Sequence, residues 1–406
     1  MPAMPMANRR RFLGESLGMA SAAAAANRVS AALPPPLGRG LIKIRDVETV
    51  VLRFPPGRPF ADAVHTFGPE RGGLVVKIHA DAGITGWGYS SFGMIAGGPS
   101  VVGAVVNEEL KPALVGQDPF FSKKLRAELW KATEYHGVKG VAQFAMAAVD
   151  IALWDICGKA LEVPVYRMLG GFHQAIPAYA MVGWYYESEE EYKRAISAAV
   201  EEGFQAVKIK VGRGPLEEDV RRFELAKQLA GKGEQVMVDA NQVFANNVPE
   251  ALRRGRAYQQ LGAFWYEEPL PPYQRDGYAE LAATLDINIA TGENLYTKYE
   301  FLDYMQHKAM DIVQPDNRRA GGVTEWMEIA ALADAFGLRV ASHGGGPTNV
   351  HMLCSMPNAI YLETGSVRNE TTYVEALKLV DGKILAPQTA GMGSELRPEF
   401  VEKHRV

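Results

Sequence analysis

The sequence predicts an α/β fold: a TIM-like barrel of alternating strands and helices, preceded by a smaller domain. Short apolar runs recur in the second half of the chain, and each ends on a polar side chain. Amphipathic stretches separate them, with a spacing close to the roughly 30 residues of one strand-helix unit. The runs span residues 207–210, 236–241, 264–268, 289–293, 312–316, 340–343 and 361–363.

The length predicts the second domain, because 406 residues exceed the roughly 250 of one barrel. Alternation predicts strands over 42–54 and 74–89. Helical periodicity follows over 101–132 and 141–169. We therefore expect four parts: a leader at 1–33, an N-terminal α+β domain at 41–171, the barrel at 172–366, and a segment at 367–406 that packs back on the N-terminal domain.

Composition excludes several classes of protein. A formal charge of −4 shows no basic excess of the kind that a nucleic-acid partner requires. The two cysteines, Cys157 and Cys354, lie far apart in apolar surroundings and form no disulfide or metal motif. No run approaches the roughly 18 apolar residues of a membrane span. We expect neither a nucleic-acid nor a membrane partner.

The N-terminus resembles a twin-arginine export signal. Arg9, Arg10 and Arg11 precede Phe12, Leu13 and an alanine-rich stretch that runs to residue 33. This resemblance implies a folded protein exported to the periplasm. The alternative is a disordered low-complexity tail on a cytoplasmic protein.

Two lysines share one face of a predicted barrel strand. One residue separates Lys208 from Lys210, so both side chains project to the same side, which in a barrel strand is the interior. Burying two ammonium groups together is costly, so nearby carboxylates or a chemical role must justify it. The alternative, two exposed lysines on an edge strand, fits poorly with the apolar residues between and around them.

Three carboxylates end consecutive predicted strands. Asp239, Glu267 and Glu293 should converge on one point, and Asn241 repeats the spacing two residues beyond Asp239. Without a cation the carboxylates would repel each other, and an all-oxygen site suits Mg²⁺. A single acidic residue at a strand end is usually structural, so the interpretation depends on the ordered set.

The next strands carry a predicted acid/base pair. Asp316 ends the run at 312–316 and His343 ends the next run, at 340–343, which places them side by side so that the carboxylate orients the imidazole. Glycines follow His343 and leave space for a ligand. Glu363 on the last strand is predicted to hydrogen-bond a developing enolate.

The chain after the leader resembles the enolase superfamily, within it the mandelate racemase subgroup of the mandelate racemase / muconate lactonizing enzyme-like family. The resemblance implies a modified TIM (β/α)7β barrel with an N-terminal α+β capping domain. The motifs that carry it are Lys-x-Lys at 208–210, Asp-x-Asn at 239–241, Glu-Glu-Pro at 267–269, Gly-Glu-Asn at 292–294, Gln-Pro-Asp at 314–316 and Ser-His at 342–343.

The resemblance also implies roles. Asp239, Glu267 and Glu293 would bind one Mg²⁺ per subunit, Lys210 would be one acid/base, and the His343–Asp316 dyad would be the other. The shared chemistry is removal of the proton α to a carboxylate, giving an enediolate held by Mg²⁺, Lys208 and Glu363. As a base near neutral pH, Lys210 needs a pKa lowered from about 10.4 toward about 7 to 8, which we attribute to Lys208 and the metal.

With bases on two faces of a substrate, either dehydration or racemisation is open. We favour dehydration of a sugar acid, an aldonate or aldarate, to a 2-keto-3-deoxy acid, because the segment expected to close over the site is polar. Lys208, Asn241, His65 and Arg318 are predicted to bind this small-molecule carboxylate substrate. The alternatives are a racemase or epimerase of a 2-hydroxy acid and a non-catalytic carboxylate-binding protein. We expect a homo-oligomer, as is usual in the family.

Overall fold

A computed structural model of the chain describes nine segments: residues 42–57, 59–68, 71–81, 83–90, 97–137, 139–186, 188–231, 235–367 and 370–406. The predicted leader, residues 1–33, lies outside these described residues. All elements named below belong to one compact unit, Ile42–Val406.

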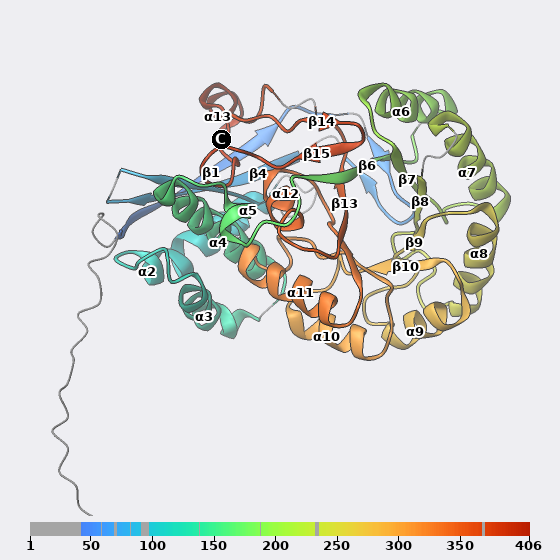
Figure 1. Cartoon of the computed structure of the whole chain (residues 1–406), viewed down its shortest axis with the longest axis horizontal. Coiled ribbons are helices and arrows are strands. Elements are labelled where there is room, and N and C mark those ends of the chain that lie inside the picture. The colour runs from blue at the N-terminus through green and yellow to red at the C-terminus, as the bar shows by residue number, and fades with distance from the viewer. Residues whose placement is uncertain are drawn as a thin grey trace, which may run out of the picture. The chain divides into compact units, whose positions relative to one another are not determined.

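An antiparallel sheet of three strands, in the order β1-β4-β5, forms the N-terminal part (Figure 1). A small hairpin of β2 and β3 precedes β4 and is not among the predicted strands. The strands are β1 (Ile44–Phe54), β2 (Phe60–Ala61), β3 (Thr66–Phe67), β4 (Arg71–Ala80) and β5 (Thr85–Ser90). Its helical elements are α1 (Gly98–Val105), a π-helical turn (Val106–Leu110), α2 (Lys111–Leu114), α3 (Ser122–Thr133), a 3₁₀ turn (Glu134–His136), α4 (Val141–Leu161) and α5 (Val165–Met168).

Helix α4 lies against this sheet at a distance that glycine permits. A Cβ at Gly88 would stand 1.8 Å from the carbonyl oxygen of Ala148, and one at Gly86 would stand 2.1 Å from that of Ala152. Among the described residues, α4 alone is long and apolar enough to cross a membrane by its length and mean hydropathy, although Asp150 and Asp155 interrupt its apolar residues. Most of it is buried in the protein, as is typical of a core helix.

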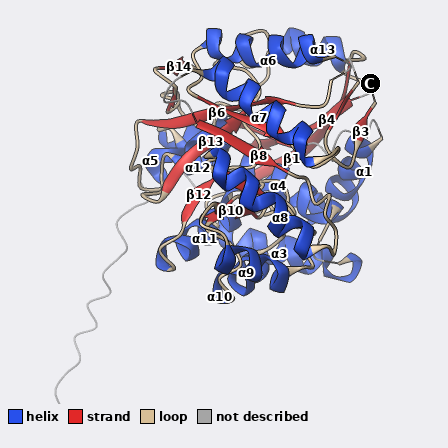
Figure 2. Cartoon of the chain, turned by 90° about the vertical axis from the view of Figure 1, so that its right-hand side faces the viewer, coloured by secondary structure: helices blue, strands red, loops and turns tan. Residues whose placement is uncertain are grey.

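Eight parallel strands close into the predicted barrel. They pair in chain order from β6 to β13, and β13 pairs with β6 (Figures 1 and 2). The strands are β6 (Ala175–Gly183), β7 (Ala206–Lys210), β8 (Gln235–Asp239), β9 (Trp265–Glu267), β10 (Asn288–Thr291), β11 (Ile312–Val313), β12 (Arg339–Ala341) and β13 (Ala359–Thr364). The helices between them are α6 (Glu189–Glu202), α7 (Leu216–Ala230), α8 (Val248–Leu261), α9 (Arg275–Thr284), α10 (Lys298–Gln306), α11 (Val323–Ala335) and α12 (Pro347–Leu353). The predicted (β/α)7β fold is confirmed.

Side chains fill the barrel interior below the strand ends. One layer consists of Tyr179, Ala206, Met237, Trp265, Ala290, Ile312 and Ala341. The outward positions of the strands pack against the helices in a second, larger core. The barrel is therefore closed at this level, and a ligand has access only at the ends of the strands.

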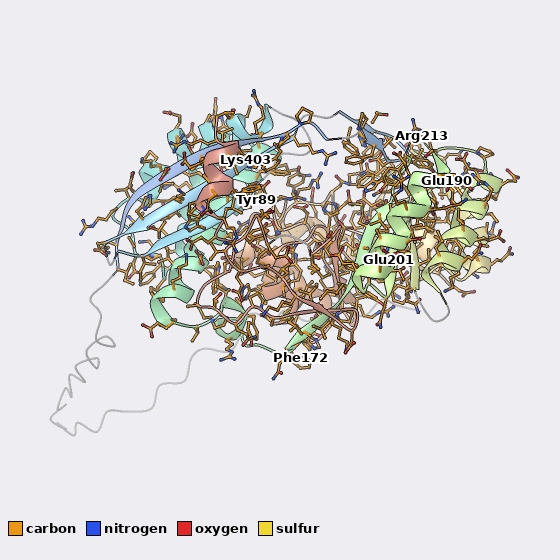
Figure 3. The ribbon with its side chains drawn as sticks, turned by 90° about the horizontal axis from the view of Figure 1, so that it is seen from above. Tyr89, Phe172, Glu190, Glu201, Arg213 and Lys403 are labelled. Carbon is orange, nitrogen blue, oxygen red and sulfur yellow. The ribbon has the colours of Figure 1, made fainter. Side chains whose placement is uncertain are left out.

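The C-terminal residues contact both parts of the molecule. Strands β14 (Leu379–Val380) and β15 (Lys383–Leu385) form a hairpin, and β15 pairs with β6 of the barrel. Helix α13 (Pro398–His404) lies instead along β1, with Lys403 beside the N-terminal sheet (Figure 3). The limits placed at residues 171 and 366 stay predictions.

Candidate active site

Three carboxylates meet at the carboxyl ends of β8, β9 and β10. Asp239 and Glu267 end adjacent strands and lie opposite each other in the register. Glu293 follows β10 after a turn at Gly292, whose φ of 134° suits glycine. Oxygens of the three carboxylates lie within 4.8 Å of one another, and all three side chains are buried. The structure thus brings together the three residues predicted to hold a metal.

The charges around this acidic cluster suit a divalent cation. The cationic side chains of Lys208, Lys210 and Arg318, together with the imidazole of His343, lie among five carboxylates. Burial, followed by repulsion from neighbouring carboxylates, raises the pKa of Glu267 to about 7. An oxygen-only ligand set with excess negative charge fits Mg²⁺. The five carboxylates are those of Asp239, Glu267, Glu293, Asp316 and Glu363.

Both lysines of β7 reach this cluster. The ammonium nitrogen of Lys210 lies 2.5 Å from Oδ2 of Asp239. That of Lys208 lies 2.5 Å from Oε1 of Glu267 and 2.5 Å from Oε2 of Glu363. Both side chains are almost fully buried. Alternation along β7 therefore presents two cations to the cluster from one side.

The pKa of Lys210 is shifted upward, opposite to the predicted lowering. Burial and the charge of Lys208 both lower it, but attraction to Asp239 and other carboxylates outweighs them, so the pKa is raised. For Lys208, attraction to Glu267 and Glu363 outweighs the effect of burial and raises the pKa. The protein's own groups do not produce the predicted lowering, because attraction to the Asp239 carboxylate contributes more than repulsion from Lys208.

Glu363 makes four hydrogen bonds or ion pairs through its two oxygens, the longest of them to Nε2 of His343 at 3.8 Å. Oε2 accepts from the hydroxyl of Tyr179 at 2.7 Å and contacts Lys208, and Oε1 accepts from the backbone N–H of Gly344 at 2.9 Å. Although burial opposes it, attraction to Lys208 and His343 lowers the pKa of Glu363. Glu363 therefore acts as an acceptor in this state.

Asp316 and His343 lie side by side, just beyond β11 and β12. Nδ1 of His343 is 2.7 Å from Oδ2 of Asp316, and Nε2 is 3.3 Å from Glu293. Burial lowers the pKa of His343, but attraction to Glu293, Glu363 and Asp316 outweighs it and raises the pKa to about 9. The imidazole therefore connects Asp316 with the flank of the cluster formed by Glu293.

Arg318, predicted to bind substrate, contacts Asp316. Its Nε lies 3.0 Å from Oδ1 and 3.1 Å from Oδ2 of that carboxylate, and Nη2 also binds Oδ2. Arg318 and His343 also line a cavity of about 150 Å³, together with Tyr89 and Tyr373. The guanidinium thus lies between the dyad and this cavity.

Asn241 lies beside the cluster. Its backbone N–H donates to Oδ1 of Asp239 at 2.9 Å, and its backbone is left-handed, with φ at 44°. Its buried side-chain oxygen has no hydrogen-bond partner among the described residues. Asn241 therefore retains an acceptor at the edge of the acidic cluster.

His65 lies on the β2–β3 hairpin. It pairs with Asp62 at 3.2 Å and remains largely exposed. Phe60 and Phe67 of the same hairpin pack against Trp184, and the Trp184 ring lies 4.6 Å from the Lys210 nitrogen. The hairpin thus reaches Lys210 through Trp184, and no contact joins His65 to the predicted catalytic groups among the described residues.

Tyr179 and Trp184 were not predicted as site residues. Tyr179 lies opposite Glu363 in the register of β6 and β13, and Trp184 directly follows β6. The continuous apolar run of residues 175–183 was the signal that could have located both. Without that strand, neither residue could be assigned to the barrel mouth.

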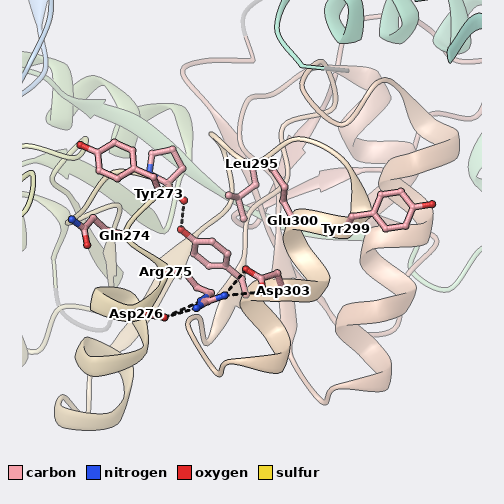
Figure 4. A pocket seen from close by; sticks show the side chains of 10 residues that line it. Tyr273, Gln274, Arg275, Asp276, Leu295, Tyr299, Glu300 and Asp303 are labelled. Carbon is pink, nitrogen blue, oxygen red and sulfur yellow. Dashed lines mark hydrogen bonds and ion pairs between the residues drawn. The ribbon is translucent and has the colours of Figure 1, made fainter. Parts of the chain in front are cut away.

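A separate hollow of about 510 Å³ lies by α9 and α10 (Figure 4). Its Arg275 pairs with Asp276 at 2.7 Å and with Asp303 at 3.0 Å. No predicted site residue lines it, so it is separate from the candidate site at the barrel mouth.

Comparison with known proteins identifies the family. The profile for the mandelate racemase / muconate lactonizing enzyme N-terminal domain matches residues 46–170, and the enolase C-terminal domain-like profile matches residues 191–400. The chain belongs to the enolase superfamily. Within it, the chain belongs to the mandelate racemase / muconate lactonizing enzyme-like family.

Three similar proteins illustrate the activities of relatives. Arabinonate dehydratase of Saccharolobus solfataricus is 31% identical over 82% of this chain and 90% of its own length. The 3,6-anhydro-alpha-L-galactonate cycloisomerase of Streptomyces coelicolor is 32% identical over 86% and 96%. The crystal structure of L-talarate dehydratase from Polaromonas sp. JS666, complexed with Mg and L-glucarate, has a TM-score of 0.83 and 30% identity, covering 90% of this chain and 98% of that one. The dehydratases among them support a hydro-lyase of the mandelate racemase type.

Proposed function

We propose that this protein is a Mg²⁺-dependent dehydratase that converts a sugar acid, an aldonate or aldarate, to a 2-keto-3-deoxy acid. One observation carries the proposal. Lys210 contacts the acidic cluster at Asp239, whereas His343 contacts it at Glu293, so two proton-transfer groups flank the cluster on different sides. A substrate carboxylate bound between them would present its α-carbon to both.

The chain's own residues would move the protons. One of Lys210 and His343 removes the α-proton, and a protonated group releases the β-hydroxyl as water. The resulting enol then takes a proton at C3 and loses its C2 hydroxyl proton, which gives the 2-keto acid. Asp316 orients the imidazole, and Lys208 supplies positive charge to the substrate carboxylate. Mg²⁺, held by Asp239, Glu267 and Glu293, would supply electrostatic stabilisation of the negative charge that develops on the substrate.

The substrate class is supported by the relatives and by the free acceptor at the site. Arabinonate and L-talarate dehydratases are named for sugar acids. The unpaired side-chain oxygen of Asn241 would accept a hydrogen bond from a substrate hydroxyl. We also propose a substrate contact for His65, from the hairpin above Trp184.

A panel of aldonic and aldaric acids tests this proposal. Each acid is incubated with the protein and Mg²⁺, and the formation of a 2-keto acid is measured. We expect one stereochemical group of acids to yield product and chelation to stop the reaction. If no acid in a comprehensive panel gives a keto product, the dehydratase proposal fails.

A racemase or epimerase is the second candidate, because two bases on different sides also permit return of the proton to the opposite face. A cycloisomerase among the relatives shows that the fold serves other outcomes. Incubation in D₂O separates the two: deuterium at Cα without loss of water indicates racemisation or epimerisation.

We also propose that residues 1–33 direct export through the twin-arginine route and that the mature protein is a periplasmic homo-oligomer. Arg9, Arg10 and Arg11 followed by Phe12 support this proposal. Deleting residues 1–33 should leave catalysis intact and keep the protein in the cytoplasm. Fractionation of the native host and sedimentation of the purified protein test the two statements.

A further inference from the structure

We infer that Arg318 is a positioning residue, which acts on the histidine through Asp316. This inference deepens the proposed function, on which its kinetic test rests. The sequence predicts substrate binding by Arg318, whereas in the structure its guanidinium contacts the carboxylate that orients His343. Three steps lead to this role.

The first step is the geometry of the carboxylate. Oδ1 of Asp316 accepts from the backbone N–H groups of Arg318 and Arg319 at 2.7 and 3.1 Å. Oδ2 is shared between the imidazole and the Arg318 side chain. A planar guanidinium that contacts both oxygens of a carboxylate restrains its rotation, which a single hydrogen bond does not. Without Arg318, Oδ2 would be held mainly by the imidazole it must orient.

The second step is the rigidity of the loop that carries Arg318. The backbone N–H of Ala320 donates to the carbonyl of Asp316 at 2.8 Å, and that of Gly322 donates to Asn317 at 2.7 Å. The side chain of Arg126, from α3, donates to the carbonyl of Gly321 at 2.9 Å. The loop is thus fixed from within and from the N-terminal domain.

Asp150 of α4 completes this support. It accepts from the backbone N–H of Thr324 at 2.9 Å and from the Thr324 hydroxyl at 2.6 Å, at the start of α11. The helix itself has no capping side chain at Gly322. A side chain from the N-terminal domain therefore caps the helix that follows the Arg318 loop, and the guanidinium starts from a fixed backbone.

The third step is the placement of Arg318 relative to the cluster. No contact joins its guanidinium to Asp239, Glu267 or Glu293 among the described residues, whereas Asp316 contacts it through three side-chain nitrogen–oxygen pairs. Its influence is therefore directed at the histidine and not at Lys210, whose partners lie on β8 and by Trp184. Loss of Arg318 should weaken one proton-transfer group selectively.

The kinetic test uses exchange of the α-hydrogen in D₂O with the two C2 epimers of a substrate acid. Variants in which Lys210 or His343 is replaced by Ala assign each epimer to the base that it faces. In Arg318→Met we expect exchange at the histidine-facing epimer to fall about 10- to 100-fold, as with other lost outer partners. Exchange at the lysine-facing epimer should stay near wild type, and Arg318→Lys should restore part of the loss.

Arg254→Met is the matched control, because Arg254 is also a largely buried arginine bound to a buried aspartate, Asp219, at 2.5 Å. It should not alter the ratio of the two exchange rates. Equal loss at both epimers in Arg318→Met, or an unchanged ratio, would overturn the positioning role.

A second measurement needs no substrate. The proton on Nδ1 of His343, bonded to Asp316, should give a far-downfield NMR signal, assigned by its absence in His343→Ala. In Arg318→Met this signal should broaden through faster exchange with water, and in Arg254→Met it should not. An unchanged signal in Arg318→Met would contradict the inference even if the proposed reaction is wrong, so the two failures are distinguishable.

Discussion

The lysine side of the barrel mouth, with Lys208 and Lys210, and the histidine side, with Asp316 and His343, position their groups by different means. The lysines lie within β7, which pairs with β6 and β8 along its length. Backbone hydrogen bonds and alternation therefore set where their side chains begin. On the histidine side, both residues lie beyond very short strands and are joined by an isolated bridge.

Side chains and close backbone contacts replace the ladder on the histidine side. Asn349 donates to the carbonyl of Gly344 at 2.6 Å, and the hydroxyl of Ser342 donates to the same carbonyl at 2.9 Å. A Cβ at Gly345 would lie 2.8 Å from the carbonyl oxygen of Glu363. The comparison shows that the two proton-transfer groups are positioned by different kinds of contact. Strand pairing fixes the backbone of the lysines, whereas individual side-chain and loop contacts fix that of the histidine.

The largest effects should come from the two bases. Replacing Lys210 or His343 by Ala should each lower turnover by roughly 10² to 10⁴-fold or more, since each removes a proton-transfer group. With one base gone, the remaining base should still exchange the α-hydrogen of the epimer that it faces, although no product forms. Turnover and deuterium incorporation are measured together.

Asp316→Asn sharpens the same comparison, because it leaves the imidazole present but poorly oriented. It should resemble the His343 variant with a smaller loss. Wild-type turnover in both the Lys210 and the His343 variants would refute the assignment of these residues as the bases.

The next effect concerns Glu293, which belongs to the acidic cluster and contacts His343. In Glu293→Gln we expect Mg²⁺ affinity to fall by roughly 10-fold or more, since a charged oxygen ligand is lost. Binding is measured by calorimetry and by the rise in Tm that Mg²⁺ gives the folded protein. Glu190→Gln, on the exposed start of α6, is the control, and an unchanged metal titration in Glu293→Gln would refute the ligand assignment.

A smaller change tests the tight backbone contact of the histidine side. Gly345→Ala would force apart the loop and β13, with a cost of about 1–3 kcal/mol in the free energy of unfolding. Activity should fall because Glu363 and His343 lie on the two segments that move. Gly365→Ala, where an added Cβ meets nothing within 4 Å, should have little effect. Equal results for the two variants, by denaturant unfolding and kinetics, would contradict this account.

The smallest effect is a pH dependence of stability near the histidine side. His351 in α12 accepts at Nδ1 from the backbone N–H of Tyr166 at 2.9 Å, while Nε2 lies 3.1 Å from the carbonyl of Met392. Burial lowers its pKa to about 4. The imidazole binds a proton more readily in the unfolded chain than in the folded protein. The contribution of His351 to the free energy of unfolding is therefore complete above about pH 6.5 and is lost as the pH falls toward 4.

At pH 5 this loss should be about 2 kcal/mol relative to pH 7.5. The free energy of unfolding is measured against pH for the wild type, His351→Gln and the exposed control His136→Gln. The His351 variant should lose that part of the pH dependence. An identical pH dependence in all three proteins would show that His351 is not held neutral.

Much of the fold and part of the site could be predicted from the sequence. Alternation placed Lys208 and Lys210 on one face, and strand ends located Asp239 and Glu267, because regular β-structure converts spacing directly into direction. The family resemblance and the fold class are confirmed. Strand β6, however, was not located, so Tyr179 and Trp184 stayed outside the predicted site.

What only the tertiary structure decided lies beyond the strands. The sequence showed that Arg318 follows Asp316 by two residues, but not whether its guanidinium meets a substrate or that carboxylate. It showed lysines near carboxylates, but not that Asp239 outweighs Lys208 in setting the pKa of Lys210. Spacing determines direction where backbone hydrogen bonds repeat; in loops, contacts between residues distant in sequence, such as Asp150 with Thr324, determine it instead.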